Sequence, residues 1–590
     1  MPSPTGDLSS SSSQYFSIID YAVFGGMLMF SAAIGVYFAF FAKRKQNTTN
    51  EYLMGSKSLG IFPISMSLIA SYISGISLLG IPAEMYSFGS QYWIVIISEA
   101  LVSLTMAVAF IPVFYGLNIT SSYEYLRLRF NQPVRLMGSI IFMIKMMLYI
   151  PNVIYMPALA FNQVTGINIH YITPVVCLVC IFYTTLGGLK AVVWTDTLQT
   201  VLMFLGVIVV MVLGTIQVGG VGVVIERTTK GDRLEFFNFD PDPTARHTVW
   251  TLTFGNYFNW LAACAVNQAM VQRCLAMPSV KQANKAILIL TFGILSIVSM
   301  CCYTGLVVFA AFHDCDPITR KLVGKSDQIL PYYVTQISKY VPGLPGLFVA
   351  GVFSAALSSM STGLNSITAV FYEDFVKPSV KKPWSEAKAS FVMKVVVVIV
   401  GTVCVGNVFL VEKLGAIIQV VKSLSGITAG ALLGTFSMGL FFPWINSAGA
   451  LAGGISSILL VSWISFGTQL NIAAGRITFP KKPLSVEGCS AAELAGLNLN
   501  QTIFYSATQT DQEVFYLFRI SYLWYTVIGV STALSVALVV SFATGANKPS
   551  DMDPRLLSPV IRRFITFNSK CDNEQAIELQ KAQEKLLSKT

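Results

Sequence analysis

Apolar runs of about 20 residues recur along this chain, and they limit its fold more than any other feature. A helix of that length crosses the hydrocarbon core of a bilayer, which is about 30 Å thick. Hydrophobic residues make up 54% of the 590 residues and charged residues only 12%, unlike the balance of soluble domains. The sequence therefore predicts an all-α polytopic membrane protein with about 13 transmembrane helices. We expect them near residues 16–42, 60–82, 90–115, 137–163, 171–187, 195–219, 248–271, 285–311, 346–372, 387–410, 414–441, 446–468 and 517–543.

The distribution of basic residues predicts how these helices are oriented. If the N-terminus lies outside, the short inner loops hold fifteen Lys and Arg residues, whereas the short outer segments hold one, Lys413. Because basic residues collect in cytoplasmic loops, we expect an extracellular N-terminus and, after an odd number of crossings, a cytoplasmic C-terminus. The net charge of +10 then faces the anionic lipid of a plasma membrane rather than nucleic acid.

Two of the predicted helices contain small or polar residues in the middle of the membrane. In the second run these are Ser74, Gly75, Gly80 and Pro82, and in the seventh they are Gly255, Asn256 and Asn259. A broken helix frees backbone carbonyls, which are tolerated at membrane depth only inside protein or along a cavity. Both positions therefore indicate a binding site. The alternative is that the small residues only let helices pack closely.

The two interrupted helices are five spans apart, so they cross the membrane in opposite directions. That relation is expected of the halves of an inverted repeat, whose substrate site lies at the interface between them. We therefore predict a 5+5 inverted-repeat core in which the first and sixth core helices are broken. The predicted organisation is an extracellular N-terminus with a first peripheral helix and inner loop (1–59), the first repeat (60–219), an extracellular loop (220–247), the second repeat (248–441), two peripheral helices with an extracellular loop at 469–516 (442–543), and a cytoplasmic tail (544–590).

The ninth apolar run carries more hydroxyl and amide groups than a helix facing lipid would. Residues i, i+3 and i+4 share one face of a helix, so the carbonyl of Ala355 and the hydroxyls of Ser358 and Ser359 converge. A break in the second run would add the carbonyls of Ala70 and Ile73. Neutral, hard oxygens suit a cation such as Na⁺. The alternative is that the Ser, Thr and Gly residues of this run serve only helix packing.

Charged residues at membrane depth add two further candidate binding positions. Asp196 and Gln199 share one face of the sixth run, and a buried acid by default indicates an ion or proton route. The alternative is a solvated Asp196 at the membrane interface, paired with Lys190. In the eleventh run Lys422 follows Gln419 by about one turn, and it would serve either as counter-charge to a substrate carboxylate or as partner of an internal acid such as Glu412 or Glu99.

The predicted loops hold features of an extracellular face. Cys315 and Cys489 fall in the two largest outer loops, where an oxidising environment permits a disulfide, although spacing does not fix the connectivity. Asn500 is the Asn-x-Ser/Thr match that lies outside in this topology, so it is the predicted glycosylation site. The three His residues are scattered and no phosphate-binding glycine loop occurs, so nothing supports a metal cluster, a catalytic triad or ATP-driven transport.

Five segments, in the same order, resemble the sodium/solute symporter family over nearly the full length of the chain. They are Ser67–Ser74, Gly187–Gln199, Val266–Arg273, Ala355–Ser359, and Leu414–Val420 with Gly439–Pro443. The last three are most similar to the branch that carries monocarboxylates, the vitamins biotin and pantothenate, or iodide. The resemblance implies inverted five-helix repeats and a sodium site formed by Ala70, Ile73, Ala355, Ser358 and Ser359. It also implies a second sodium position, found in some members, at Asp196 and Gln199.

These features predict a sodium-coupled symporter that imports a small organic anion, either a monocarboxylate or a carboxylate-bearing vitamin, by alternating access. No paired nucleophile and base is visible at membrane depth, so the chain is not expected to be an enzyme. Sugar-carrying members have Asn and His where this chain has Tyr72 and Ser77, which argues against a sugar. The alternatives are a sodium-dependent iodide or sugar symporter and a non-transporting solute sensor. The predicted substrate residues are Tyr72, Ser74, Gly75, Ser77, Asn259, Trp260 and Gln419.

Overall fold

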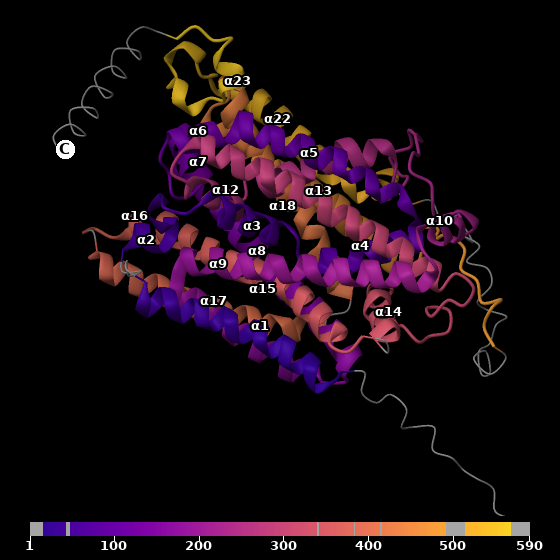
Figure 1. Ribbon diagram of the computed structural model, residues 1–590. Coiled ribbons are helices and arrows are strands. Elements are labelled where there is room, and N and C mark those ends of the chain that lie inside the picture. Colours follow the sequence, from indigo (N-terminus) through magenta and orange to yellow (C-terminus); the bar gives the residue numbers. More distant parts are fainter. Residues whose placement is uncertain are drawn as a thin grey trace, which may run out of the picture.

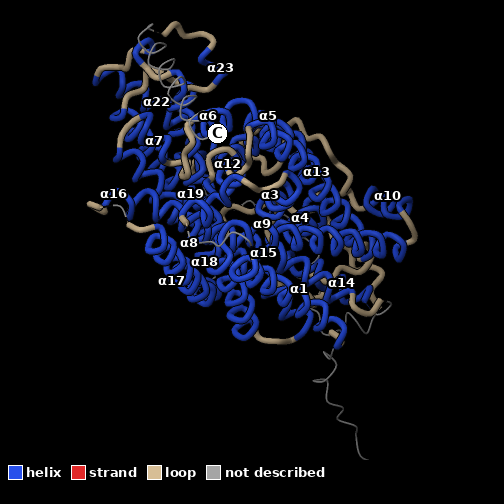
Figure 2. The backbone as a smooth tube through the Cα atoms, turned by 60° about the vertical axis from the view of Figure 1, so that its left-hand side comes forward, coloured by secondary structure: helices blue, strands red, loops and turns tan. Residues whose placement is uncertain are grey.

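The computed structural model describes residues 16–42, 48–338, 341–382, 384–413, 416–490 and 514–567, and within 411–424 it describes the backbone alone. Over these ranges the chain consists of helices and the loops that join them, with no β-strand (Figure 2). Neighbouring helices run roughly side by side through the molecule, and the first helix and the last one lie on opposite sides of it (Figure 1). The predicted all-α fold is confirmed.

The helices follow the apolar runs of the sequence. They are α1 (Ile18–Val36), α2 (Thr49–Met54), α3 (Ile61–Tyr72), α4 (Gly75–Phe88), α5 (Val95–Thr105), α6 (Ile111–Gly116), α7 (Glu124–Arg129), α8 (Gln132–Thr165), α9 (Ile169–Val218), α10 (Val221–Lys230), α11 (Asn256–Cys264), α12 (Gln268–Leu275), α13 (Val280–Ala311), α14 (Ile329–Ile337), α15 (Leu344–Val370), α16 (Lys377–Ser379), α17 (Glu386–Lys413), α18 (Ala416–Phe441), α19 (Ser447–Ala473), α21 (Tyr516–Arg519), α22 (Tyr525–Thr544) and α23 (Pro559–Arg562). Turns of π-helix occur at Tyr37–Phe41, Met106–Phe110, Thr251–Gly255 and Phe371–Val376. Several helices begin at a capping residue; the side chains of Asn131, Ser279 and Asn446 accept backbone N–H groups at the starts of α8, α13 and α19.

Nine helices of the described chain are long and apolar enough to cross a membrane, or ten if Thr49–Lys57 and Ile61–Tyr72, bent by 111°, count as one span. The protein is therefore a multi-pass membrane protein. The sequence predicted about thirteen transmembrane helices, more than these nine or ten, and the difference has identifiable causes. The second and seventh runs form short, broken helices, α9 joins two predicted spans, and the side chains of α18 are described only from Ser425 onward, which leaves Ser425–Phe441 as a shorter apolar helix. The number thirteen and the repeat layout stay predictions.

Helix α15 forms the centre of the molecule. All of its residues except Leu347 are buried, and it packs against α1, α3, α4, α8, α9 and α17 (Figure 1). A helix that is apolar or small on every side is expected to be surrounded by other helices. Its hydroxyl groups therefore face protein rather than lipid.

Helix α9 is interrupted at Gly188, which adopts φ 54° and ψ −153°. Fifty helical residues would extend about 75 Å, more than twice the hydrocarbon thickness. Only glycine adopts this backbone conformation readily. Both halves reach α15: the Tyr183 hydroxyl lies 3.4 Å from the Leu357 carbonyl oxygen, and the Leu202 carbonyl lies against Gly351. The break falls between the predicted spans 171–187 and 195–219.

The second predicted helix is broken between α3 and α4, at Ile73 and Ser74, next to the position that the sequence indicated. The seventh is also broken, but not at Gly255, Asn256 or Asn259 as predicted. Those residues form a π-helical turn and the start of α11, and the interruption lies at 265–267. Asn256 stays helical because its side chain has a partner: its amide nitrogen donates to the Ser98 hydroxyl at 2.7 Å.

Loops from distant parts of the chain pack together at one end of the bundle. Cys315 is disulfide-bonded to Cys489, across 174 residues of sequence. The buried Arg233 guanidinium donates to the carbonyls of Tyr86 at 3.0 Å and Pro483 at 2.9 Å and lies over the Phe309 ring. These contacts fix the loops on the ends of α4 and α13. Asn500 lies outside the described residues.

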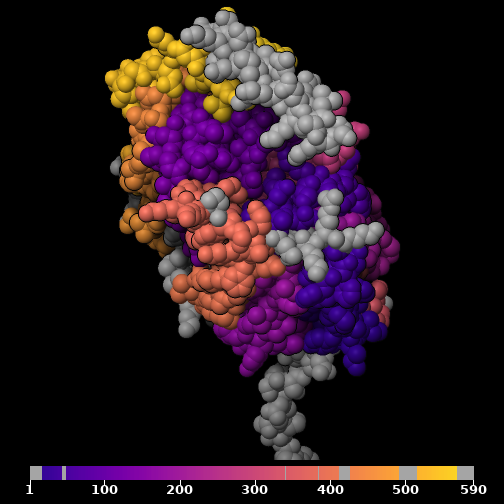
Figure 3. All heavy atoms as spheres, turned by 90° about the vertical axis from the view of Figure 1, so that its left-hand side faces the viewer, coloured from indigo at the N-terminus to yellow at the C-terminus, as the bar shows by residue number. Residues whose placement is uncertain are grey.

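The C-terminal segment packs back onto helices from the first quarter of the chain. Yellow residues near 550–565 lie on purple residues near 110–130 in Figure 3. The Ser558 hydroxyl donates to the Ala109 carbonyl at 3.0 Å, and the Tyr125 hydroxyl donates to the Leu556 carbonyl at 2.9 Å. The described part of the segment after α22, residues 545–567, therefore packs on the helix bundle.

The contact between α4 and α13 depends on Gly305. A Cβ atom there would lie 2.7 Å from the Pro82 carbonyl oxygen and 2.8 Å from the Pro82 Cα atom. We expect Gly305→Ala to destabilise the protein by about 1–3 kcal/mol, because the backbone of α4 must move. Thermal unfolding of the purified protein in detergent measures the loss. Gly80→Ala is the control in the same helix pair, since nothing lies within 4 Å of its Cβ position; an equal loss in both variants would contradict the prediction.

Candidate functional site

The break between α3 and α4 leaves a carbonyl at membrane depth without its helical partner. Ile73 is extended, with φ −85° and ψ 114°, so the chain after it cannot continue the hydrogen bonds of α3. Ser74 instead caps α4, where its hydroxyl accepts the Ser77 N–H at 3.4 Å. The Ala70 carbonyl accepts a hydrogen bond from the Ser358 hydroxyl of α15 at 2.7 Å. The break and α15 are thus joined directly.

Four of the five predicted sodium ligands belong to one buried group of oxygens. The Ser358 hydroxyl lies 2.7 Å from the Ala70 carbonyl oxygen and 3.1 Å from that of Ala355. The Ser359 hydroxyl lies 3.0 Å from the same Ala355 oxygen. The fifth, the Ile73 carbonyl, lies at the break and shares none of the hydrogen bonds described for the other four. The structure therefore brings Ala70, Ala355, Ser358 and Ser359 together.

This oxygen group has the chemistry that a sodium ion requires. Carbonyl oxygens carry lone pairs, and a serine hydroxyl can rotate from donating to a carbonyl to directing its own lone pairs at a cation. All of these oxygens are neutral and hard, and no thiol or imidazole is among them. The donor set fits Na⁺.

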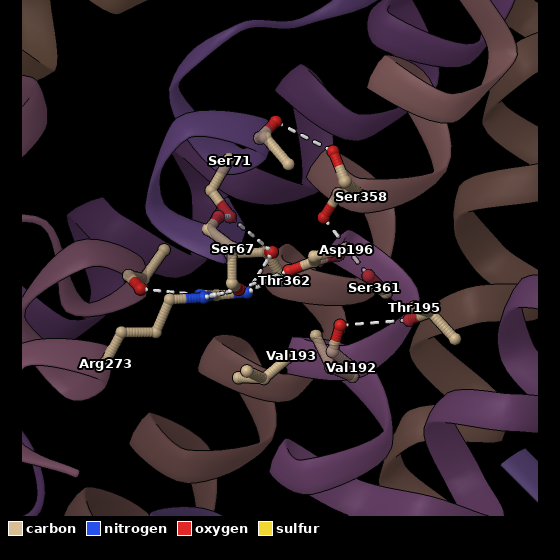
Figure 4. Close-up of polar contacts among 12 residues, drawn as sticks. Ser67, Ser71, Val192, Val193, Thr195, Asp196, Arg273, Ser358, Ser361 and Thr362 are labelled. Atoms are coloured by element: carbon tan, nitrogen blue, oxygen red, sulfur yellow. Dashed lines mark hydrogen bonds and ion pairs between the residues drawn. The ribbon is translucent and has the colours of Figure 1, made fainter. Parts of the chain in front are cut away.

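A second polar group lies on another face of α3, around the buried pair Asp196 and Arg273 (Figure 4). The Arg273 Nη2 atom is 3.0 Å from Asp196 Oδ2, and its Nε atom donates to the Ser67 hydroxyl at 2.6 Å. Ser67 in turn donates to Asp196 Oδ2 at 2.5 Å. Because neither charged side chain is more than 1% exposed, each balances the other inside the protein.

The same guanidinium connects the pair to the core helix. Arg273 donates to the Thr362 hydroxyl of α15 and to the Ala269 carbonyl, 2.8 Å away, in its own helix α12. The Thr362 hydroxyl also lies 2.9 Å from the Ser71 hydroxyl of α3. Arg273 thus joins α3, α9, α12 and α15 in one network.

The alternative pairing of Asp196 with Lys190 is wrong. Lys190 follows the break at Gly188 and lies 2.6 Å from Glu51 of α2, whereas Asp196 faces the interior. Asp196 Oδ1 and both polar atoms of Gln199 are buried without a hydrogen-bond partner among the described residues. These atoms are available to a further ligand, although the other carboxylate oxygen of Asp196 is already held by Arg273.

Two of the predicted substrate residues stack on each other. The Tyr72 and Trp260 rings lie 4.2 Å apart between centroids, at 22°. The Tyr72 hydroxyl donates to Glu99 Oε1 of α5 at 2.9 Å. Tyr72 is the last residue of α3 before the break, so this aromatic pair lies beside the oxygen group.

The other predicted substrate residues are more scattered. Ser74 and Ser77 form the first turn of α4. Gly75 packs tightly, since a Cβ there would lie 2.7 Å from Pro157. Asn259 accepts a hydrogen bond from Thr526 of α22 at 3.4 Å, away from the aromatic pair. The side chains of Gln419 and Lys422 lie outside the described residues.

Sequence reasoning missed three residues that the structure places at the site. The sequence alone assigns no role in the site to Arg273, Thr362 or Glu99. Each was a charged or polar residue within an apolar run, which was the available signal; its partner lies too far along the sequence to be found by spacing.

A broken-helix pair around a buried polar centre is typical of secondary transporters. The chain belongs to the sodium:solute symporter family, whose model matches residues 52–457. This is a family of transporters rather than enzymes, and membership implies sodium-coupled symport.

Among the relatives is the sodium-coupled monocarboxylate transporter 2 of Mus musculus, 38% identical over 555 residues, which cover 94% of this chain and 88% of that one. The sodium-coupled monocarboxylate transporter 1 of Xenopus laevis is 40% identical, with 90% and 86% covered. The sodium-dependent multivitamin transporter of Oryctolagus cuniculus is 36% identical, with 96% and 88% covered. A solved Na⁺-coupled sialic acid symporter has the same fold, with a TM-score of 0.74 at 24% identity over 91% of this chain and 100% of that one.

Removal of the Arg273 side chain tests the buried ion pair. We expect Arg273→Met to destabilise the protein by about 3–5 kcal/mol, because it leaves Asp196 charged and unpaired in the interior. Arg273→Met combined with Asp196→Asn is expected to recover part of that loss. Thermal unfolding in detergent measures both. Lys230→Met, which removes an exposed partner of Glu226, is the control and should change little; a similar effect in all three variants would refute the assignment.

Proposed function

We propose that this protein imports a small organic anion, a monocarboxylate or a carboxylate-bearing vitamin, by sodium-coupled alternating access. The observation that carries the sodium part is the oxygen group of Ala70, Ala355, Ser358 and Ser359 between a helix break and the central helix. The substrate class is supported by the relatives, which are named as monocarboxylate and multivitamin transporters. The Tyr72 and Ser77 positions support it further, because they lack the amide and imidazole of sugar carriers.

Sodium would act by joining the two sides of the break. The Ser358 hydroxyl of α15 donates to the Ala70 carbonyl of α3. A bound Na⁺ would draw both oxygens, together with Ala355, Ser359 and the Ile73 carbonyl, onto one centre. This fixes the end of α3 and with it the Tyr72 and Trp260 stack, so ion and substrate bind with reciprocal coupling. One charge that crosses a potential of 100 mV contributes about 2.3 kcal/mol to uptake.

We also propose a second sodium position, at Asp196 and Gln199. Support comes from the buried, unpartnered Asp196 Oδ1 and Gln199 Oε1 atoms on one face of α9. An ion there would share Asp196 with Arg273. The ratio of charge moved to labelled substrate taken up distinguishes one ion from two.

The proposed orientation is an extracellular N-terminus and a cytoplasmic C-terminus in the plasma membrane. It rests on the distribution of Lys and Arg between the loops. In this orientation the loops joined by Cys315 and Cys489 are extracellular, as a stable disulfide requires. We also propose that residues 60–219 and 248–441 form two inverted repeats.

An uptake screen in proteoliposomes tests the substrate class. Lactate, pantothenate, biotin, iodide and glucose are offered with and without an inward Na⁺ gradient. We expect sodium-dependent accumulation of at least one of the carboxylates and none of glucose. Accumulation of iodide alone would overturn the proposal that the substrate is an organic anion. Binding of a compound without uptake of any would indicate a sensor.

The serine ligands are tested one at a time. We expect Ser359→Ala to weaken the apparent Na⁺ affinity of uptake about tenfold or more, since it removes an oxygen that the protein offers in place of water. Sodium titration of initial uptake rates, corrected for surface expression, provides the measurement. Ser366→Ala is the control on the same helix, because that buried hydroxyl bonds only the Thr362 carbonyl at 2.7 Å. Unaltered sodium dependence in Ser359→Ala would exclude this site.

A further inference from the structure

Glu99 is a buried acid, and among the described residues only one of its two carboxyl oxygens has a hydrogen-bond partner. The residue is 5% exposed and lies in α5, within an apolar span. Its Oε1 atom accepts the Tyr72 hydroxyl at 2.9 Å, whereas Oε2 is buried without a hydrogen-bond partner in the part of the chain that the structure describes. A buried polar atom without a partner is rare, and it indicates either that a ligand binds there or that the atom carries a proton.

Among the described residues, the surroundings of Glu99 provide no counter-charge. The titratable groups near enough to interact with its charge are Tyr72 of α3, Tyr92 before α5, Cys264 of α11 and Cys302 of α13. No Lys, Arg or His nitrogen lies within 4 Å of its carboxyl group among the described residues. Lys145 of α8 interacts with the Cys264 thiol. Among the side chains that the structure describes, which do not include that of Lys422, an ionised Glu99 would be an isolated charge at membrane depth, which is strongly disfavoured.

Glu99 nevertheless lies where a substrate is expected. Its partner Tyr72 stacks on Trp260, whose Nε1 atom is likewise buried without a partner. Tyr72 is two residues after Ala70, which belongs to the oxygen group. Two buried polar atoms without a partner among the described residues, one on the acid that holds Tyr72 and one on the ring that stacks on it, are therefore available to a polar ligand.

We propose that Glu99 binds the transported carboxylate as the neutral acid, its Oε2–H donating a hydrogen bond to the anion. The proton stays on Glu99, and Tyr72 holds the other oxygen. The Trp260 N–H is the second donor. The inference rests on the proposed function, which it deepens by naming a donor for the substrate carboxylate. It also predicts that loss of the proton places two carboxylates side by side, which excludes the substrate.

The sign of the pH dependence follows directly. Uptake requires protonated Glu99, so it is retained at lower pH and lost as pH rises. Above the midpoint the protonated fraction falls about tenfold per pH unit. The substrate does not add to this trend, because an ordinary aliphatic carboxyl titrates near about pH 4 and stays ionised.

The test is the Na⁺-dependent initial rate of labelled lactate uptake into proteoliposomes at fixed Na⁺ and membrane potential, from about pH 6 to about pH 9.5. We expect the wild-type rate to fall at the alkaline end and Glu99→Gln to remove that fall, because the amide N–H₂ donates at every pH. Glu226→Gln is the matched control, since this exposed glutamate pairs with Lys230 on α10; its profile should follow that of the wild type. A Glu99→Gln variant that keeps the alkaline fall, or that lowers uptake equally at every pH, would overturn the inference.

Tyr72→Phe gives an independent readout. It keeps the ring on Trp260 but removes the hydroxyl that stabilises ionised Glu99, so the midpoint of the profile should move to higher pH by roughly one unit. An unchanged or lower midpoint counts against the inference. Absence of Na⁺-dependent lactate uptake by the wild type, where pantothenate and biotin also fail, would instead overturn the proposed function.

Discussion

The hydrogen bond from the Ser358 hydroxyl to the Ala70 carbonyl is the contact on which the site depends. A helix that stops at Tyr72 inside an apolar bundle leaves carbonyls without partners, and each unpaired group at that depth costs several kcal/mol. The break persists because α15, buried along almost its whole length, presents hydroxyls to it. The same need that stabilises the break makes its oxygens available to a cation.

How far the sequence predicted this site depends on the range of each interaction. Helical spacing sufficed for Ala355, Ser358 and Ser359, which lie on one turn, and for the break beside Ser74, where Ser and Gly interrupt an apolar run. Spacing misplaced the second break, because a polar Asn256 can remain helical when Ser98, 158 residues earlier, accepts its amide. Spacing also suggested Lys190 as the partner of Asp196, because the actual partner, Arg273, is 77 residues away in the sequence.

The buried ion pair adds little to the net stability of the fold, but it helps to fix how the helices are arranged. Asp196 and Arg273 lose hydration when they are buried, and their mutual attraction only partly offsets that cost. Apolar residues of similar size would pack as well. What the pair contributes is connection: the guanidinium bonds Ser67, Thr362 and its own helix at once, so α3, α12 and α15 cannot move apart without exposing a charge. A packed interface of this kind has discrete arrangements rather than a continuous range.

The last two turns of α3 therefore carry three sets of contacts on different faces. Ser67 and Ser71, one turn apart, join the Arg273 and Thr362 network, Ala70 joins the oxygen group, and Tyr72 joins Glu99 and Trp260. Because these residues belong to one short rigid helix, a ligand that changes one set of contacts shifts the others. Coupling between two sites requires an element whose position both ligands bias. In the proposed mechanism the end of α3 would be that element, since the break at Ile73 frees it from α4 while α15 holds it.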